Sequence, residues 1–423
     1  MFRGDSYREV FANRDFRALW LGQALAHLGQ SIAYVAVALY VYELTGSAQE
    51  LSFALALQLL PWVVIGPMAG LLADRIERKK VLVAAYLTQT SLVALLPFTS
   101  SLAQIYTLVF LSSLLAPVAQ IVRAAALPAV TGRRLFVRGS SLDIVAYNAA
   151  NVVGPPLSGW LVSLVGARPT FFVVVGCFLG AALLVLQVVI PSPRAGNRHV
   201  LELRRTWHDL WEGGRFLFRT PVLRYLVLLS CISSLAWSTP DVAAVVYLTD
   251  ILGVGGGEYG VLRGTVSLST ALGVYVLGRY ARLLPRQRLL VGGIVLAGLA
   301  YVSVLGKPGM PALLFLWFIS GVGWGANWLI DNALWAEATP DEVRGRVYSL
   351  GSAVISLAEV GTALLGGWLV NLLGPVQALA VIGATISLGT IALSALTGGY
   401  KAVADFEKRK SFPSPSQGGA RGE

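Results

Sequence analysis

The sequence predicts an all-α integral membrane protein with twelve transmembrane helices in two pseudo-symmetric six-helix bundles. Three observations support this fold class. The 423 residues are 56% hydrophobic and only 13% charged, whereas an average soluble domain carries about a quarter charged residues. The apolar residues form twelve long runs, and the two halves of the chain share a repeat. Lipid is therefore the expected solvent for much of the surface.

The apolar runs are long enough to cross a bilayer, whose core of about 30 Å needs roughly 20 helical residues. The polar segment 1–17 precedes a run that exceeds the length of a signal-peptide core, so this run is predicted to be a retained first span. The predicted spans are 18–42, 49–72, 80–98, 103–127, 142–165, 169–190, 222–248, 259–281, 288–306, 311–335, 346–371 and 375–397.

These spans divide the chain into four parts. We expect an N-terminal bundle over 1–190, a cytoplasmic linker over 191–220, a C-terminal bundle over 221–400 and a disordered cytoplasmic tail over 401–423. The linker has two prolines, several arginines and an amphipathic segment around Trp207 to Phe218, which should lie at the membrane surface.

Lysines and arginines predict the orientation, because they favour cytoplasmic loops. The net charge of +11 falls between apolar runs, which favours lipid headgroups over nucleic acid as partners. With the N-terminus inside, the even-numbered loops hold most basic residues, and the opposite side keeps only Arg168, Arg263 and Lys307. The sequence therefore predicts a multi-pass protein of a prokaryotic cytoplasmic membrane with both termini in the cytoplasm.

A repeat with a shift of 208 residues relates the two halves. Residues 159–166 have the sequence GWLVSLVG, and residues 367–374 have GWLVNLLG. The same shift places Arg138 on Arg346. Duplication of a six-helix unit explains this spacing and predicts two halves related by an axis along the membrane normal.

The loop after the second span carries the most specific motif. From Gly70 to Lys80 it has the sequence GLLADRIERKK. This resembles the signature loop of the major facilitator superfamily: a glycine, Asp-Arg four residues later, and a basic cluster. Glu77 departs from the usual glycine or aspartate. The segment Leu44 to Ser47 and the loop around Arg346 resemble the subgroup of drug, macrolide and siderophore exporters. The resemblance covers roughly residues 15–397 and implies the major facilitator fold and secondary transport.

The resemblance also implies roles for two motifs. The loop residues Gly70, Asp74, Arg75 and Arg78 would form a latch that stabilises the outward-facing state, with the Asp74 carboxylate at the N-terminus of a neighbouring helix. The alternative is that the basic residues only set topology. The segment from Gly154 to Gly159 resembles the Gly-Pro motif of antiporters, with Ser158 in place of a second glycine. Gly154 and Pro155 would bend the fifth span, which favours antiport.

Polar residues recur at helical spacing within several spans. Because such stripes cannot all face lipid, the sequence predicts a central, partly hydrated cavity between the halves. Tryptophans beside carboxylates could hold a lipophilic cation there, or they could instead be interfacial anchors. The candidate cavity residues are Gln23, Gln30, Tyr34, Asn148, Asn151, Trp237, Trp324 and Asn327.

Three ionisable residues are candidates for proton coupling. Glu359 lies near the middle of the eleventh span and is the first choice, although it could instead be a structural hydrogen-bonding group. Asp241 is the second. His27 could titrate near neutral pH or simply form a hydrogen bond. Arg123 and Asp331 are 208 residues apart and opposite in charge, so they are predicted to pair and close an inner gate. Arg123 could pair with Asp143 instead.

Together these features predict a proton-coupled exporter of a hydrophobic or amphipathic small molecule that works by alternating access. We expect its partners to be that substrate, protons and membrane lipids, and we expect a monomer. An importer or uniporter of the same fold, for a sugar, anion or lipid-like substrate, is one alternative, and a sensor or scaffold without transport is another. No phosphate loop, metal cluster or nucleophile triad is visible in the sequence, so neither an enzyme nor a cofactor is expected.

Overall fold

The computed structural model describes residues 5–65, 77–190, 203–280, 285–340 and 342–411. Every regular element within these ranges is a helix. Eleven helical stretches there are long and apolar enough to cross a membrane. The one predicted span that is not among these eleven is the fifth, 142–165, which is less apolar because of Asn148 and Asn151 and forms the second part of helix α6. The predicted fold class is confirmed.

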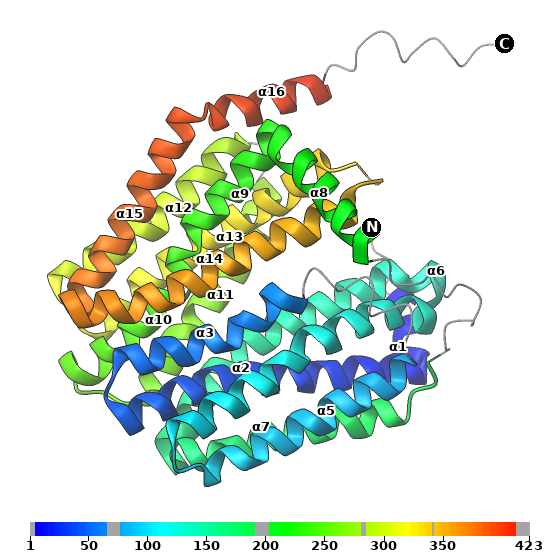
Figure 1. Cartoon of the computed structure of the whole chain (residues 1–423), viewed down its shortest axis with the longest axis vertical. Helices are drawn as coiled ribbons and strands as arrows, with labels where there is room; N and C mark the ends of the chain where they lie inside the picture. Colours follow the sequence, from blue (N-terminus) through cyan, green and yellow to red (C-terminus); the bar gives the residue numbers. More distant parts are fainter. Residues whose placement is uncertain (1–4, 66–76, 191–202, 281–284, 341, 412–423) are drawn as a thin grey trace.

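The N-terminal bundle is the lower group of helices in Figure 1. The Asn13 side chain caps its first long helix by accepting hydrogen bonds from the backbone N–H groups of Asp15 and Phe16. Ser101 and Gln104 form a capping box at another helix start. The elements are α1 (Asp5–Ala12), α2 (Arg14–Thr45), α3 (Ala48–Ile65), α5 (Arg78–Leu95), η2 (Leu96–Phe98), α6 (Leu102–Val165) and α7 (Ala167–Leu186).

One glycine separates the two spans of α6. The sequence predicts a loop between residues 127 and 142, but the structure continues the helix through most of this segment. The helix reverses at Gly132, whose backbone has φ 68° and ψ 166°. Only glycine adopts this region readily, so a tight turn replaces the predicted loop.

The C-terminal bundle is the upper group in Figure 1. Its first span consists of three consecutive segments, of which the last, η3, is a single stretch of π-helix. The elements are α9 (Pro221–Ser233), α10 (Leu235–Val246), η3 (Tyr247–Ile251), α11 (Gly256–Tyr280), α12 (Arg286–Val302), η4 (Ser303–Gly306), α13 (Met310–Ala338), α14 (Arg344–Leu373) and α15 (Pro375–Leu396).

The amphipathic segment of the linker forms helix α8 (Leu203–Arg219). This helix docks on the start of α14. Glu212 forms an ion pair with Arg346, with 2.7 Å between Oε2 and Nη1. A side chain at Gly213 would approach the Cβ of Arg346 to 2.9 Å. The linker therefore contacts the C-terminal bundle directly.

The prediction of disorder from residue 401 onward is wrong for the first part of the tail. Residues Gly399–Ser411 form helix α16, which packs against α9 and α15. Val403 is fully buried, and Ala402 and Phe406 pack against the core. These apolar residues share one helix face, which the abundant lysine and arginine of the segment concealed. Residues 412–423 lie outside the described part of the chain.

The two bundles meet closely at one end of the molecule. There α6 crosses α11 through glycines, and an added side chain at Gly159 would lie 2.5 Å from the carbonyl oxygen of Gly256. Nearby, Ser52 of α3 donates a hydrogen bond to the Ala363 carbonyl of α14, and the Gly367 N–H donates to the Ser52 hydroxyl at 3.2 Å. We call this region the closed end. It lies where α2 ends and α3 begins.

A bulky residue in the glycine contact should separate the bundles. A side chain at Gly260 would lie 2.9 Å from Gly159 Cα, and overpacking of this kind costs about 1–3 kcal/mol. We expect Gly260→Val to lengthen the distance between spin labels at Ser100 and Lys307 in a cysteine-free background, as measured by pulsed electron paramagnetic resonance.

Gly292→Val is the matched control, because an added side chain there meets no atom within 4 Å. An unchanged distance distribution for Gly260→Val would show that the contact does not set the separation of the bundles.

Candidate functional site

A cavity of about 450 Å³ lies between the bundles and extends into the N-terminal one. Its size falls within the range of about 300–1,000 Å³ that is common for small-molecule sites. Both bundles contribute to its walls: α2, α3, α5, α6 and α7 on one side, and α11 and α14 on the other. Of the predicted site residues, it is lined by His27, Gln30, Tyr34, Asn151, Pro155 and Glu359.

An ion pair within the C-terminal bundle lies at the edge of the cavity nearest to the closed end. Arg263 of α11 lies 3.4 Å from Asp241 of α10, between Nη2 and Oδ2. The hydroxyl of Tyr34, from α2 in the other bundle, donates to the same carboxylate at 2.9 Å. The Arg263 guanidinium also lies 5.1 Å from the centre of the Tyr34 ring, a distance typical of a cation–π contact. The cluster therefore connects the two bundles.

Arg263 differs in place from the sequence-based prediction, which counted it among the basic residues on the side opposite the cytoplasm. It lies in the second turn of α11, and its side chain lines the cavity with Ser267. The available signal was this spacing of four residues, which puts both residues on one helix face.

A second hydrogen bond joins the bundles nearer to the molecular surface. The Tyr42 hydroxyl, at the end of α2, lies 2.9 Å from both carboxylate oxygens of Asp250 in η3. Tyr42 lies two helical turns beyond Tyr34, so two tyrosine–aspartate bonds follow the same line along α2. Both lie at the closed end, and sequence reasoning had not identified the Tyr42 bond.

Glu359 lines the cavity from α14 with Ser356 one turn before it. Its side chain is half-buried. No hydrogen bond or ion pair of its carboxylate is present within the part of the chain that the structure describes. Asp241 thus has a cation beside it, whereas the Glu359 carboxylate faces the cavity without one.

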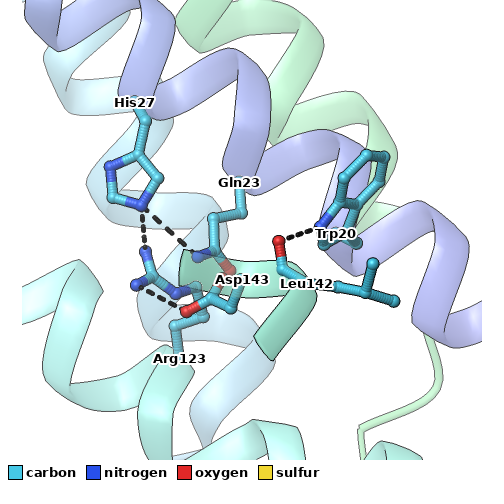
Figure 2. A network of polar contacts seen from close by, with 6 residues as sticks. All are labelled: Trp20, Gln23, His27, Arg123, Leu142 and Asp143. Atoms are coloured by element: carbon cyan, nitrogen blue, oxygen red, sulfur yellow. Dashed lines mark hydrogen bonds and ion pairs between the residues drawn. The ribbon is translucent and has the colours of Figure 1, made fainter. Parts of the chain in front are cut away.

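His27 belongs to a buried polar network of the N-terminal bundle (Figure 2). Arg123 Nη1 and Gln23 Nε2 both lie 3.3 Å from His27 Nε2. Arg123 Nη2 also lies 3.4 Å from Asp143 Oδ2. Because a guanidinium can only donate, His27 Nε2 acts as the acceptor. This geometry supports a structural role for His27, and it places Gln23 in the network and away from the cavity lining.

The predicted pair of Arg123 and Asp331 is not formed in this structure. Arg123 takes the alternative partner, Asp143, which was also considered from the sequence. Asp331 lies beside the indole of Trp335 within the C-terminal bundle. An approach of Arg123 to Asp331 therefore stays a prediction for another conformation.

Other predicted cavity residues lie elsewhere. Trp324 is buried in α13 beside Tyr301, and Asn327 donates to the Leu290 carbonyl at 3.3 Å. Both side chains are used in packing within the C-terminal bundle. Asn148 is exposed on α6. The side chain of Trp237 lies outside the described part of the structure.

Of the two predicted motifs, the structure describes the latch only in part. Gly70, Asp74 and Arg75 of the latch lie outside the described residues, while Arg78 begins α5. In the other motif, a side chain at Gly154 would collide with Ser31, at 2.5 Å from its hydroxyl oxygen. The helix α6 continues through Pro155. This motif therefore allows α2 and α6 to approach closely.

Sequence reasoning missed several lining residues that carry carboxamides. Their signal was a glutamine within each of three predicted apolar spans. They are Gln58 of α3, Gln89 of α5 and Gln120 of α6.

Comparison with known proteins agrees with this architecture. The multidrug efflux pump Tap of Mycolicibacterium fortuitum is 26% identical over 353 residues, which cover 81% of this chain and 86% of Tap. The enterobactin exporter EntS of Escherichia coli O1:K1 / APEC is 26% identical over 369 residues, which cover 83% of this chain and 84% of EntS.

The crystal structure of a bacterial homolog to the human lysosomal transporter Spinster, in an inward-facing and unoccupied conformation, shares the fold. Its TM-score is 0.70 at 14% identity, over 96% of this chain and 99% of that chain. The sequence profile of the Major Facilitator Superfamily matches residues 19–240 and 226–418. Since these two matches cover most of the sequence, the chain belongs to the Major Facilitator Superfamily of secondary membrane transporters.

Proposed function

We propose that this transporter exports small molecules across the cytoplasmic membrane in exchange for protons. The observation that carries the proposal is the Glu359 carboxylate, which lines the cavity between the bundles and has no partner among the described residues. A carboxylate within the membrane is costly unless a cation balances it. Among the described residues the lining has one arginine, Arg263, and it is already paired with Asp241. A proton, or a cationic group of the substrate, would therefore balance Glu359.

Alternating access needs a closed side and an open side. The two tyrosine–aspartate bonds and the glycine contact hold the bundles together at the closed end. Away from this end, Arg78 and Arg346 lie in the first turns of α5 and α14, and Arg138 lies shortly after the reversal of α6 at Gly132. The positive-inside rule assigns these basic residues to the cytoplasm. The state described here would then face the cytoplasm, where an exporter collects its substrate. The names of Tap and EntS support this direction of transport.

The experiment that tests the proposal begins with a ligand-stabilisation screen of the purified protein. Compounds that stabilise it are then offered to inside-out membrane vesicles with an imposed pH gradient. An antiporting exporter accumulates them when the vesicle interior is acidic. An importer moves them in the opposite direction, and a sensor or scaffold shows no flux.

Removal of the Glu359 charge should abolish coupling. We expect Glu359→Gln to lose accumulation driven by the pH gradient, because the amide cannot carry a proton between the two sides. Stabilisation by a neutral ligand should persist, since the shape of the cavity is kept. The measurement is flux in inside-out vesicles beside thermal unfolding with ligand.

Glu43→Gln is the control for this experiment, because Glu43 is exposed near the end of α2. Full gradient-driven flux in Glu359→Gln would remove Glu359 from the mechanism.

The Arg263–Asp241 pair should be needed for stability. Arg263→Gln leaves the buried Asp241 carboxylate without its cation, and breaking a buried pair costs about 3–5 kcal/mol. The free energy of unfolding can be measured by denaturant titration in mixed micelles. Adding Asp241→Asn should recover most of the loss, whereas Arg279→Gln on the exposed side of α11 should change stability by less than about 0.5 kcal/mol. Additive losses in the double variant would show that the two residues are not coupled.

If Arg123 and Asp331 form an inner gate, exchanging their charges should restore transport that each single substitution reduces. Arg123→Asp and Asp331→Arg should each reduce transport, because each leaves a like-charged pair when the cytoplasmic side closes. The double variant should recover part of the activity in the vesicle assay. If the double variant transports no faster than the less active of the two single variants, Arg123 and Asp331 do not form a gate.

A further inference from the structure

Five carboxamide side chains line the wall of the cavity that the N-terminal bundle forms. They project from four different helices, α2, α3, α5 and α6. Segments that are far apart in the sequence therefore contribute to one wall. Figure 1 places α5 on the side of the N-terminal bundle away from the C-terminal bundle, so the cavity reaches deep into this bundle. The carboxamide residues are Gln30, Gln58, Gln89, Gln120 and Asn151.

Two of these amides have buried polar atoms without partners. Gln89 is only 2% exposed. Its Nε2 donates to the Ser112 carbonyl at 3.2 Å, and its Oε1 has no hydrogen-bond partner. The Nε2 of Gln58 is buried and has none either. One acceptor and one donor on residues that line the cavity are therefore unpaired in this state, and leaving such groups unpaired is costly in a protein interior.

We propose that this amide wall binds an uncharged, hydroxyl-rich part of the substrate, such as a sugar or a polyphenol. The inference rests on the proposed transport function and names the substrate chemistry of that cavity. A hydroxyl both donates and accepts, so neighbouring hydroxyls can pair with both the N–H groups and the oxygens of these carboxamides. An ammonium group only donates and would leave the carboxamide N–H groups unpaired. A wholly apolar group would leave the N–H groups and the oxygens unpaired.

The rest of the lining agrees with this division of the cavity. The ionisable groups Arg263 and Glu359 belong to the C-terminal bundle, on the other wall. His27 is engaged with Arg123. Trp62 and Phe178 add aromatic surface on the side of the amides, and such faces pack against the apolar face of a sugar ring or an aromatic ring. The wall is thus neutral, hydrogen-bonding and partly aromatic.

A binding experiment without a gradient tests this assignment separately from transport. The protein is placed in lipid nanodiscs, which avoids detergents with sugar headgroups, and is titrated with two pairs of fluorescent coumarins. Methylumbelliferyl glucoside is compared with methylumbelliferone methyl ether, and esculetin with its dimethyl ether. The first pair tests sugar hydroxyls and the second tests phenolic hydroxyls, while each ether lacks the donors.

The wild-type protein should bind at least one hydroxylated compound more tightly than its ether. Gln58→Met and Gln89→Met should each lower the binding affinity for that compound by about three- to tenfold, which is the loss expected for one neutral hydrogen bond. The ethers should be unaffected. Gln187→Met is the matched control, because Gln187 lies exposed at the end of α7. Gln58 is the less buried of the two residues, so its variant decides the question if Gln89→Met does not fold.

Equal affinity for both members of each pair, or no binding of either member, would overturn the assignment. The assignment would also be overturned if Gln58→Met lowered the affinity for the hydroxylated compound and for its ether by the same factor. These outcomes leave the Glu359-dependent flux untouched, and failure of that flux would leave the binding ratios intact. The two proposals therefore fail separately.

Discussion

The close approach of the two bundles at the closed end is the constraint on which the site depends. Backbone atoms of α6 and α11 touch there because Gly159, Gly256 and Gly260 carry no side chains. This contact brings Tyr34 of one bundle within hydrogen-bonding distance of Asp241 in the other. It also places Glu359 of α14 in the same cavity as the polar residues of α2. A wider separation would remove both the shared carboxylate and the enclosed walls.

The length and apolar character of the spans could be predicted from the sequence because lipid imposes both. A helix must be about 20 residues long to cross the bilayer, and its surface must be apolar. The positions of individual polar residues were harder to predict. Helical spacing shows which residues share a face, but it does not show which neighbour that face meets. Trp324 and Asn327 share a polar stripe, for example, and the structure uses them within the C-terminal bundle.

The missed residues share a physical cause. Arg263 lies only two turns from the start of α11. From the sequence alone, a position so near the helix end could lie either at the membrane surface or in the cavity. Gln58 is the lone polar residue in an apolar run and Gln89 lies among threonines and a serine, so neither formed a recognisable glutamine stripe. Their common site arises only when helices from distant parts of the chain pack together. The apolar face of α16 was hidden for another reason: its charged residues suggested disorder, although Val403 is fully buried.

The internal duplication explains why charged and polar partners face one another across the bundle interface. Residues at equivalent positions of the two halves lie on opposite sides of the axis that relates the halves. If such residues are also close to this axis, they meet. Tyr42 and Asp250 are separated by 208 residues, which is the length of the repeat, and their side chains are hydrogen-bonded at the closed end.

Arg123 and Asp331 are separated by the same 208 residues. Arg123 lies before the reversal of α6 at Gly132, and Asp331 lies toward the end of α13, so both lie away from the closed end. Rocking the bundles would open one end and close the other, and the equivalent positions near the axis at the closing end would then meet. One repeat length thus accounts for a bond formed in this state and for a partner expected in the alternate state. In this state Arg123 is held by Asp143 and His27, so the proposed pairing of Arg123 with Asp331 would require an exchange of partners within a buried network.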